Sequence, residues 1–403
     1  MRHYQQFEVE LKWYGKINYE HISMKNANKS ALVVMFFIAA ISCSEKKDSI
    51  GDIIHLDVSK SYPEKIITLE DIADVKYIQL EFDDEYLFRD SPEYISSSTI
   101  VIKGGAKSSD FLFFTSDGKP KSKFNHYGRG QGEYMSTSSI VYDEAEDNLL
   151  VMSSNKILSY SSNGEYNYSL SFPENARINC MFDYDKESLL IYHESEAYSK
   201  NFVRISKKDA SVIEEIDIPD HKYISLTARI KSSEMVSVYF AQVINIVKYK
   251  NGFLLTDHSS DTVFFYGENS ELKPVLVRTP PIFEMDPYVL INSYLEIGDY
   301  LFLQRNKVKV ENDGMPLDYL MIDKRDQSVY KQKIFLNDYK GKEINLGPET
   351  ISSTFSSEMG FIRLNLEELK NAYDENKLSG KLKKMVEASD DDSNDIFMIL
   401  DFK

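Results

Sequence analysis

Short apolar runs separated by polar turns fill most of the chain, and no long helical pattern occurs before about residue 365. Within the runs, apolar side chains alternate with polar ones, as in ILSYSSNGEYNYSLSF, where two runs flank Asn163-Gly164. Alternation with a period of two predicts β-strands. Asn-Gly between two such strands predicts a hairpin turn whose two central residues both take a positive φ. The pattern therefore predicts a chain built mainly from β-hairpins.

The same hairpin unit recurs along the chain. Its turns lie at Asp117-Gly118, Asn163-Gly164, Lys208-Asp209, Asn269 and Asp326, and a further strand such as NLLVMSS or GFLLTDH precedes each hairpin. Four-stranded units repeated every ~40–50 residues are typical of an all-β propeller, whose blades bury their faces against neighbouring blades. A two-sheet sandwich also contains short strands, but it does not explain the recurrence of one whole pattern. Residues 44–403 allow six blades of about 60 residues or seven of about 51, and we expect six.

The two ends of the repeat differ from its middle. Near the C-terminus, MGFIRLNLEEL predicts a strand that leads into a short helix, LSGKLKKMVEASD predicts a second helix, and NDIFMILDFK predicts a closing strand. Before the first unit, IIHLDVS and DVKYIQLE predict two more strands. Because a propeller closes without an exposed edge when its terminal strands share a blade, we expect both N-terminal strands to pair with the last blade.

The segment from Met24 has the parts of a bacterial signal peptide. Lys25 and Lys29 are followed by the apolar run Ala31–Ile41 and then by small residues up to Cys43. The length of the run falls within the ~7–15 residues of a signal peptide and below the ~20 that a membrane-spanning helix needs. Ala-Ile-Ser-Cys at its end resembles a lipobox, in which the cysteine becomes the first residue and carries the lipid. A plain secretory signal with an incidental cysteine is the alternative.

This segment divides the chain into four parts. We expect residues 1–23, which are polar and mixed in charge, to be a mis-annotated leader, and residues 24–43 to be the signal peptide. Residues 44–52 are then a polar tether, and residues 53–403 form the propeller. The protein is accordingly expected in the cell envelope as an outer-membrane lipoprotein, either periplasmic or surface-exposed.

Composition narrows the range of partners. A net charge of -17 and a pI near 5.0 argue against nucleic acid, because phosphate binding needs clustered Lys and Arg. With Cys43 lipidated, Cys180 has no partner for a disulfide, and we expect it to be a buried strand residue. No zinc, calcium or nucleophile-elbow motif is present in the sequence. Neither a metal, a cofactor nor a catalytic residue is therefore predicted.

One glycine-rich stretch, FNHYGRGQGEY at residues 124–134, stands out. Its G-x-G-x-G spacing differs from the dinucleotide-binding pattern, and the residues that follow predict a strand where a phosphate site needs a helix N-terminus. The stretch also lacks the Gly-Lys-Ser/Thr of a P-loop. We therefore interpret it as the connection from the outer strand of one blade to the inner strand of the next, with Tyr134 packed between blades.

GRGQGEY is similar to the GRGPGEY-type motif of the six-bladed β-propeller lipoproteins of Gram-negative gut bacteria, with Gln131 where that family usually has proline. DIADVKYIQLE, the lipobox and the closing DDDSNDIFMILDFK fit the same family, although Asp395 replaces the proline usual after Asn394. The resemblance spans nearly all of residues 43–403. It implies the propeller fold and says little about function.

Connections from outer to inner strands lie on the face where propellers usually bind ligands. The candidate ligand-binding residues are His126, Arg129, Glu133 and Tyr134 in the glycine-rich loop, with Arg177, His221 and Asp286 in equivalent connections. A purely structural role for the loop is the competing interpretation, since glycine allows positive φ and close chain approach.

These observations leave three functional hypotheses. The first is a lipid-anchored module that binds a glycan, peptide or partner protein at the channel mouth. The second is an envelope polysaccharide lyase or hydrolase that uses carboxylates with Arg or His at the same face. The third is a structural subunit docked to an outer-membrane uptake complex. Clustering of His126, Arg129, Glu133 and His221 in a concave pocket would favour the enzyme.

Overall fold

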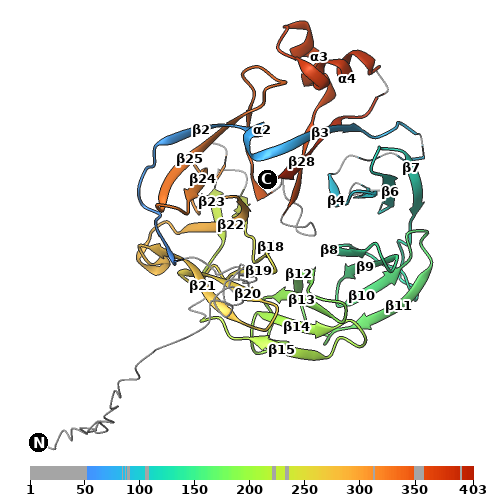
Figure 1. Ribbon diagram of the computed structural model, residues 1–403. Coiled ribbons are helices and arrows are strands. Elements are labelled where there is room, and N and C mark those ends of the chain that lie inside the picture. Colours follow the sequence, from blue (N-terminus) through green and yellow to red (C-terminus); the bar gives the residue numbers. More distant parts are fainter. Residues whose placement is uncertain are drawn as a thin grey trace, which may run out of the picture. The chain divides into compact units, whose positions relative to one another are not determined.

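Six β-sheets follow one another around a central axis in the computed structural model (Figure 1). The structure describes residues 52–83, 85–86, 88, 91–104, 109–219, 224–231, 236–311, 314–348, 358–390 and 393–403. The predicted leader, the signal peptide with Cys43 and all but the last residue of the tether lie outside these ranges. The six sheets confirm the propeller, and the alternative of seven blades is wrong.

Blades 1 to 3 are regular four-stranded antiparallel sheets whose strands follow one another in sequence from the central axis outwards. Blade 1 contains β4 (Pro92–Ile95), β5 (Thr99–Lys103), β6 (Phe111–Thr115) and β7 (Pro120–Phe124). Blade 2 contains β8 (Ser139–Asp143), β9 (Asn148–Ser153), β10 (Lys156–Tyr160) and β11 (Tyr166–Ser171). Blade 3 contains β12 (Ile178–Asp183), β13 (Ser188–His193), β14 (Phe202–Ser206) and β15 (Val212–Ile216).

Blades 4 to 6 are completed by the N-terminal segment. Blade 4 contains β18 (Ile246–Tyr249), β19 (Gly252–Thr256), β20 (Thr262–Gly267) and β21 (Leu272–Thr279), and β1 (Ile54–Asp57) pairs with β21 in parallel. Blade 5 contains β22 (Val289–Ile297), β23 (Tyr300–Lys307), β24 (Leu317–Asp323) and β25 (Ser328–Phe335). On β25, β2 (Glu64–Thr68) pairs in parallel and the short β26 (Glu343–Ile344) pairs antiparallel. Blade 6 consists of β27 (Met359–Leu364), β28 (Ile396–Phe402) and β3 (Ala73–Gln79) in the described residues.

The ends of the chain meet in blade 6, as a closed ring requires. The C-terminal strand β28 pairs antiparallel with β3, which confirms the expected role of DVKYIQLE. The expectation for IIHLDVS is wrong, because β1 lies on blade 4 and not on the last blade. The helices α3 (Leu366–Asp374) and α4 (Gly380–Ala388) lie between β27 and β28 in sequence, as predicted, and α2 (Leu69–Ile72) joins β2 to β3.

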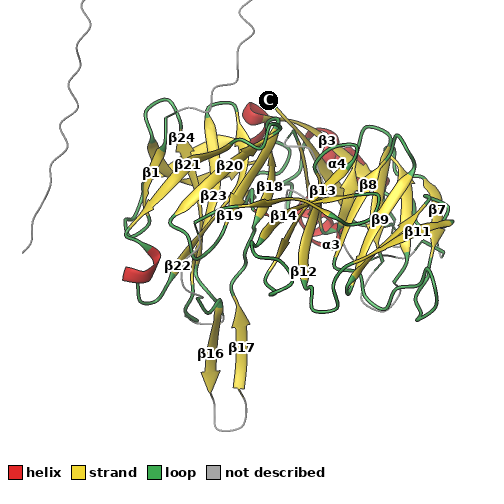
Figure 2. Ribbon diagram, turned by 90° about the horizontal axis from the view of Figure 1, so that it is seen from below, coloured by secondary structure: helices red, strands yellow, loops and turns green. Residues whose placement is uncertain are grey.

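A hairpin and a short helix lie in the connections between blades. The hairpin of β16 (Thr227–Lys231) and β17 (Val236–Phe240) connects blade 3 to blade 4 and protrudes from the blades in Figure 2. The short 3-10 helix η1 (Ile282–Glu284) connects β21 to β22. Within the described residues, no helix is long and apolar enough to cross a lipid bilayer.

The turns between the third and fourth strands share one conformation. The residues with positive φ in the five turns are Gly118, Gly164, Ala210, Ser270 and Gln327, each directly after an Asp or Asn. Only this second residue has positive φ, so the expectation that both central residues would take it is wrong. In blades 1 to 3 the strand register shifts beside the turn, as in a hairpin with a one-residue bulge. In blade 4 the shift lies farther from the turn, between Val263 and Phe264.

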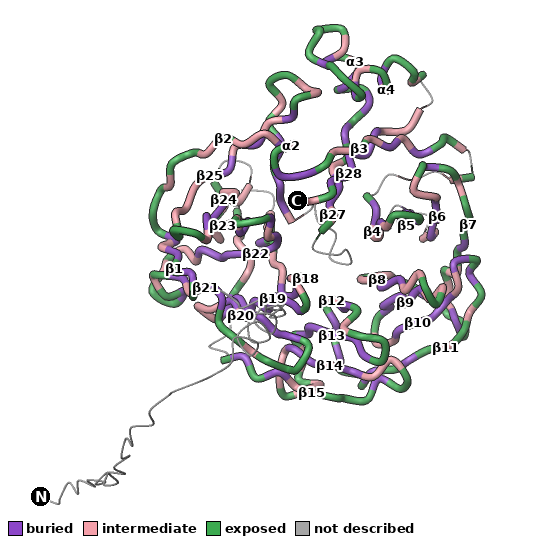
Figure 3. The backbone as a smooth tube through the Cα atoms, in the orientation of Figure 1, coloured by how far each residue is buried: buried purple, intermediate pink, exposed green. Residues whose placement is uncertain are grey.

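Burial explains why the second strands lack strict alternation. All six residues of β13 are buried, because both faces of an inner strand pack against neighbouring blades. Outer strands such as β11 alternate between exposed residues and residues that are partly or fully buried (Figure 3). The core therefore consists of apolar layers between blades, and one such layer contains Phe111 and Phe113 of blade 1 with Leu149 and Tyr160 of blade 2.

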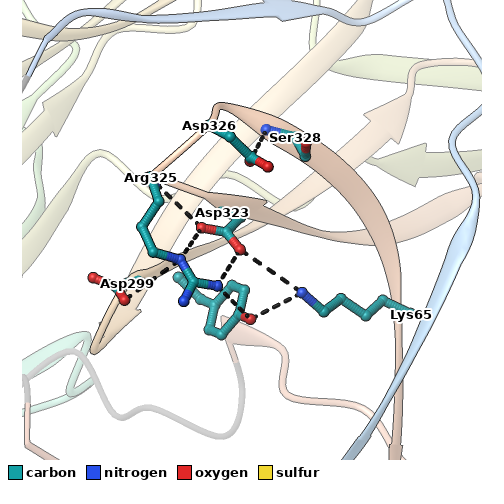
Figure 4. A network of polar contacts seen from close by, with 7 residues as sticks. Lys65, Asp299, Asp323, Arg325, Asp326 and Ser328 are labelled. Carbon is teal, nitrogen blue, oxygen red and sulfur yellow. Dashed lines mark hydrogen bonds and ion pairs between the residues drawn. The ribbon is translucent and has the colours of Figure 1, made fainter.

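A polar network fastens β2 to blade 5 (Figure 4). The Nζ of Lys65 lies 4.6 and 4.7 Å from the ring centres of Tyr300 and Tyr330, and it donates a hydrogen bond of 2.9 Å to the Tyr300 hydroxyl. The same Nζ lies 3.8 Å from Oδ2 of Asp323. Arg325 binds the Asp323 carboxylate and holds its pKa at about 2. The network thus links the N-terminal segment to two turns of blade 5.

Candidate functional site

The glycine-rich loop folds around the side chain of Glu133. In this connection between β7 and β8, the backbone N–H of Gly130 donates a hydrogen bond of 2.6 Å to Oε2 of Glu133. A Cβ on Gly128 would lie only 2.1 Å from the same oxygen. Gly132 has a φ of +71°, which other residues rarely adopt. A side chain at Gly128 would displace the Glu133 carboxylate from this position, and Gly132 supplies the positive φ that the loop requires.

Tyr134 anchors this loop between blades 1 and 2. Its side chain is fully buried, and its ring centre lies 5.7 Å from that of Phe111 and 6.2 Å from that of Tyr160. The hydroxyl donates a hydrogen bond of 2.7 Å to the carbonyl of Ser109 and accepts one of 3.1 Å from the backbone N–H of His126. Burial raises the pKa of Tyr134 to about 12. This is the packing between blades that the structural interpretation predicted.

His126 forms a second contact between the same blades. Its ring stacks on that of Tyr160 with ring centres 5.2 Å apart, and its Nε2 lies 2.6 Å from the carbonyl oxygen of Gly164 in the β10–β11 turn. The enzyme hypothesis needs His126 and Glu133 as acid–base groups, but both make structural contacts within or beside the loop. Their surroundings add no support to that hypothesis.

The remaining predicted site residues lie apart in sequence and come from different connections. Arg129 is exposed at the tip of the loop, Arg177 is exposed between β11 and β12, and Asp286 is exposed between β21 and β22. Among the described residues, no hydrogen bond or ion pair joins these three to one another. His221 lies outside the described residues. The ligand-binding role of all seven residues remains a prediction.

Metal binding and cysteine chemistry have little support in the described part of the chain. No group of three His, Cys, Asp or Glu side chains is placed there to hold a metal ion. Cys180 lies on the strand β12 as expected, but as a free cysteine that is partly and not fully buried. Burial of its thiol raises its pKa to about 12. A thiol with so high a pKa is protonated at neutral pH and is a poor nucleophile.

The β16–β17 hairpin is a feature of the structure that was not predicted from the sequence. Its root is fixed, because Ile224 and Ala241 pack with Ile282 and Leu290 of the next connection and of β22. The backbone N–H of Ala241 also donates a hydrogen bond of 2.8 Å to the carbonyl of Leu226. Beyond this root the two strands leave the core (Figure 2). The hairpin thus projects from the blades, while the residues at its root are packed in the core.

One face of the projecting strand β17 is apolar and exposed. Val236, Val238 and Phe240 are 53%, 42% and 76% exposed, and they alternate with Ser237 and Tyr239, so that they share one face. The register places exposed Arg229 opposite Val238. Three exposed apolar side chains in a row differ from the scattered single ones of an ordinary surface.

A signal for this hairpin was present in the sequence. The turns at Asp209 and Asn269 are separated by more residues than the earlier turns, and VSVYF within this interval has alternating apolar residues. The additional length belongs to a hairpin inserted between blades, and not to a larger blade.

The hairpin, the glycine-rich loop and η1 all lie in connections from an outer strand to the next inner strand. They therefore leave the blades at equivalent ends. β1 runs parallel to β21, toward the end at which β21 passes to η1 and β22. The chain consequently approaches blade 4 from the end opposite to the hairpin.

Comparison with known proteins identifies relatives at the level of fold and family. BF0058 from Bacteroides fragilis NCTC 9343, which its name assigns to the exported proteins, matches with a TM-score of 0.59 and 16% identity over 87% of this chain and 100% of that chain. A member of the duf4221 family from Bacteroides vulgatus ATCC 8482 gives a TM-score of 0.39 and 11% identity over 82% of this chain and 99% of its own. No curated protein matches the sequence. The family model described as "Domain of unknown function (DUF4934)" matches residues 53–401, and the chain therefore belongs to this family.

Proposed function

We propose that this member of the DUF4934 family is a lipid-anchored cell-envelope module that binds a partner protein through the β16–β17 hairpin. The observation that carries the proposal is the exposed apolar row of Val236, Val238 and Phe240 on a hairpin whose root is packed into the core. Exposure of such a row to water is unfavourable by about 25 cal/mol per Å² of apolar surface, and a partner that covers it removes this penalty.

The backbone of the hairpin favours a protein as the partner. β16 and β17 pair only with each other in the described part of the chain, so each strand has an open edge. Such edges bind other strands through backbone hydrogen bonds, and natural proteins usually protect them. A partner strand can add to this edge while its apolar side chains contact Val238 and Phe240. Arg229 on the same face favours an acidic group at the rim of that partner.

The proposal also includes a lipid anchor at Cys43 in the outer membrane. Cys43 precedes β1 in the sequence and is separated from it by the mostly polar residues 44–52. Location in the outer membrane and lipidation at Cys43 are parts of this proposal, and they are supported by the lipobox-like Ala-Ile-Ser-Cys sequence.

Site-specific photo-crosslinking in living cells tests this proposal. A photoreactive phenylalanine analogue at Val238 or Phe240 is expected to yield one discrete adduct with another protein. The matched control is Ile66 on β2, which is 71% exposed but has no apolar row beside it. The adduct is expected to disappear when Phe240→Asp is combined with the analogue at Val238. No adduct at either hairpin position, or the same adduct at Ile66, contradicts the proposal, as does an adduct with the mass of two copies of this chain.

A further inference from the structure

We infer that a cavity between blades 2 and 3 binds an acidic saccharide. The cavity has a volume of about 600 Å³. It is lined by Tyr168 of β11, Lys186 and Glu187 of the β12–β13 turn, Ser206 at the end of β14, and Lys207 and Lys208 of the β14–β15 turn. This volume falls in the range of ~300–1,000 Å³ typical of small-molecule sites. The lining turns are at the blade ends opposite to the hairpin connections, so this site is independent of the proposed protein-binding surface.

The residues that line the cavity include more basic than acidic side chains, unlike the protein as a whole. Three of its lining residues are lysines and one, Glu187, is acidic, whereas the whole chain carries a net charge of -17. Lysines that converge on a cavity in so acidic a protein form a local site for a carboxylate or sulfate. The acidic surface elsewhere repels long polyanions, so the site suits a short acidic ligand better than a nucleic acid.

The three ammonium groups differ in their availability to a ligand. Nζ of Lys207 lies 2.5 Å from Oδ1 of Asp183 and donates a hydrogen bond of 2.8 Å to the carbonyl of Asp185, so its position is fixed. Lys186 is 86% exposed and its Nζ lies 4.0 Å from Oε1 of Glu146, a distance at the limit of an ion pair. Lys208 makes no ion pair within the described residues. Lys186 and Lys208 are therefore the groups that a ligand can bind without displacing a close partner.

Tyr168 provides an apolar surface beside these charges. Its ring packs against the apolar layer between blades 2 and 3, and its hydroxyl accepts a long hydrogen bond of 3.4 Å from Nδ2 of Asn148. The ring is thereby held in place at the cavity wall. A sugar ring has an apolar face that can lie against an aromatic ring, and its hydroxyls match polar groups such as the Ser206 hydroxyl. Together with the lysines, this combination fits a saccharide that carries carboxylate or sulfate groups.

Titration calorimetry with the full chain tests this inference. The probe is an oligogalacturonate, and its methyl-esterified form is the matched ligand with the same rings and no charge. A sulfated oligosaccharide distinguishes recognition of sulfate from recognition of carboxylate. We expect the wild-type protein to bind at least one acidic form about tenfold more tightly than the methyl ester, because charged groups strengthen the hydrogen bonds that they accept.

Variants of the cavity give the second part of the test. The double variant K186Q/K208Q is expected to bind the acidic oligosaccharide about tenfold more weakly, and Tyr168→Leu, which retains an apolar side chain, several-fold more weakly. Lys119→Gln is the matched control, because Lys119 occupies the corresponding turn of blade 1 outside the cavity. Circular dichroism melting checks that each variant is folded. Absence of binding by the wild-type protein, equal affinity for the methyl ester, or equal loss in Lys119→Gln overturns the inference.

Discussion

Removal of the Tyr134 hydroxyl tests whether the glycine-rich loop stabilises the packing between blades 1 and 2. In Tyr134→Phe the ring keeps its contacts, but the carbonyl of Ser109 loses its donor and the N–H of His126 loses its acceptor. An unsatisfied polar group at such a site costs about 1–3 kcal/mol, and we expect a loss of stability in this range. The raised pKa of about 12 keeps the hydroxyl protonated at neutral pH, so that it can donate.

The assay is urea unfolding followed by circular dichroism, in which the midpoint shifts in proportion to the lost stability. Tyr127→Phe is the matched control, since Tyr127 lies in the same loop, is 56% exposed, and its hydroxyl makes no hydrogen bond within the described residues. Arg129→Ala is the second control, because Arg129 is exposed at the tip of the loop. A Tyr134→Phe midpoint equal to that of wild type, or a larger effect in either control, would refute the structural role of the loop.

Three further predictions concern the turns, the N-terminal segment and processing. Gly164→Ala is expected to cost more stability than Gly341→Ala in urea unfolding, because both have positive φ but only at Gly164 would a Cβ lie 2.5 Å from a phenylalanine Cβ, whereas at Gly341 nothing lies within 4 Å. Arg325 lowers the pKa of Asp323 to about 2 from 3.8, so the carboxylate contributes about 1–2 kcal/mol above pH 4 that is lost as the pH falls toward 2. Acid titration of Asp323→Asn should lack this component, and an unchanged profile contradicts the assignment. Trp13 is the only tryptophan, so the processed protein should show tyrosine but no tryptophan fluorescence, and tryptophan emission would contradict removal of the leader.

The repeating part of the fold could be predicted because its signals are local. Each turn combines an Asp or Asn with a following residue of positive φ, as at Asn163 and Gly164, and apolar strands flank it within a few residues. The same holds for the C-terminal helices and for β28. The type of turn was predicted less well, because a pair such as Asn-Gly fits both the turn with two positive φ angles and the bulged turn.

Partners distant in sequence could not be predicted in the same way. β1 contains only four residues, and its alternation is equally compatible with the edge of any blade. Its position on β21 depends on the path of the chain across blades 4, 5 and 6. No local sequence pattern predicts that path. The structural role of Gly128 and Gly130 could not be predicted for a related reason. A glycine-rich stretch gives the same sequence signal whether it surrounds a ligand or the carboxylate of Glu133.

The path of the N-terminal segment accounts for a difference between the outer strands of the blades. The outer strand of blade 1, β7, reads PKSKF, and lysines on an open edge prevent pairing with other molecules. The outer strand of blade 4, β21, contains VLV instead, and its Leu276 is fully buried where β1 pairs with it. Ile334 on β25 is likewise fully buried where β2 pairs. Leu170 on β11 and Ile216 on β15 are also buried, although no N-terminal strand covers these outer strands, so packing between blades buries such positions. What β1 and β2 add is backbone pairing, which occupies the otherwise open edges of β21 and β25.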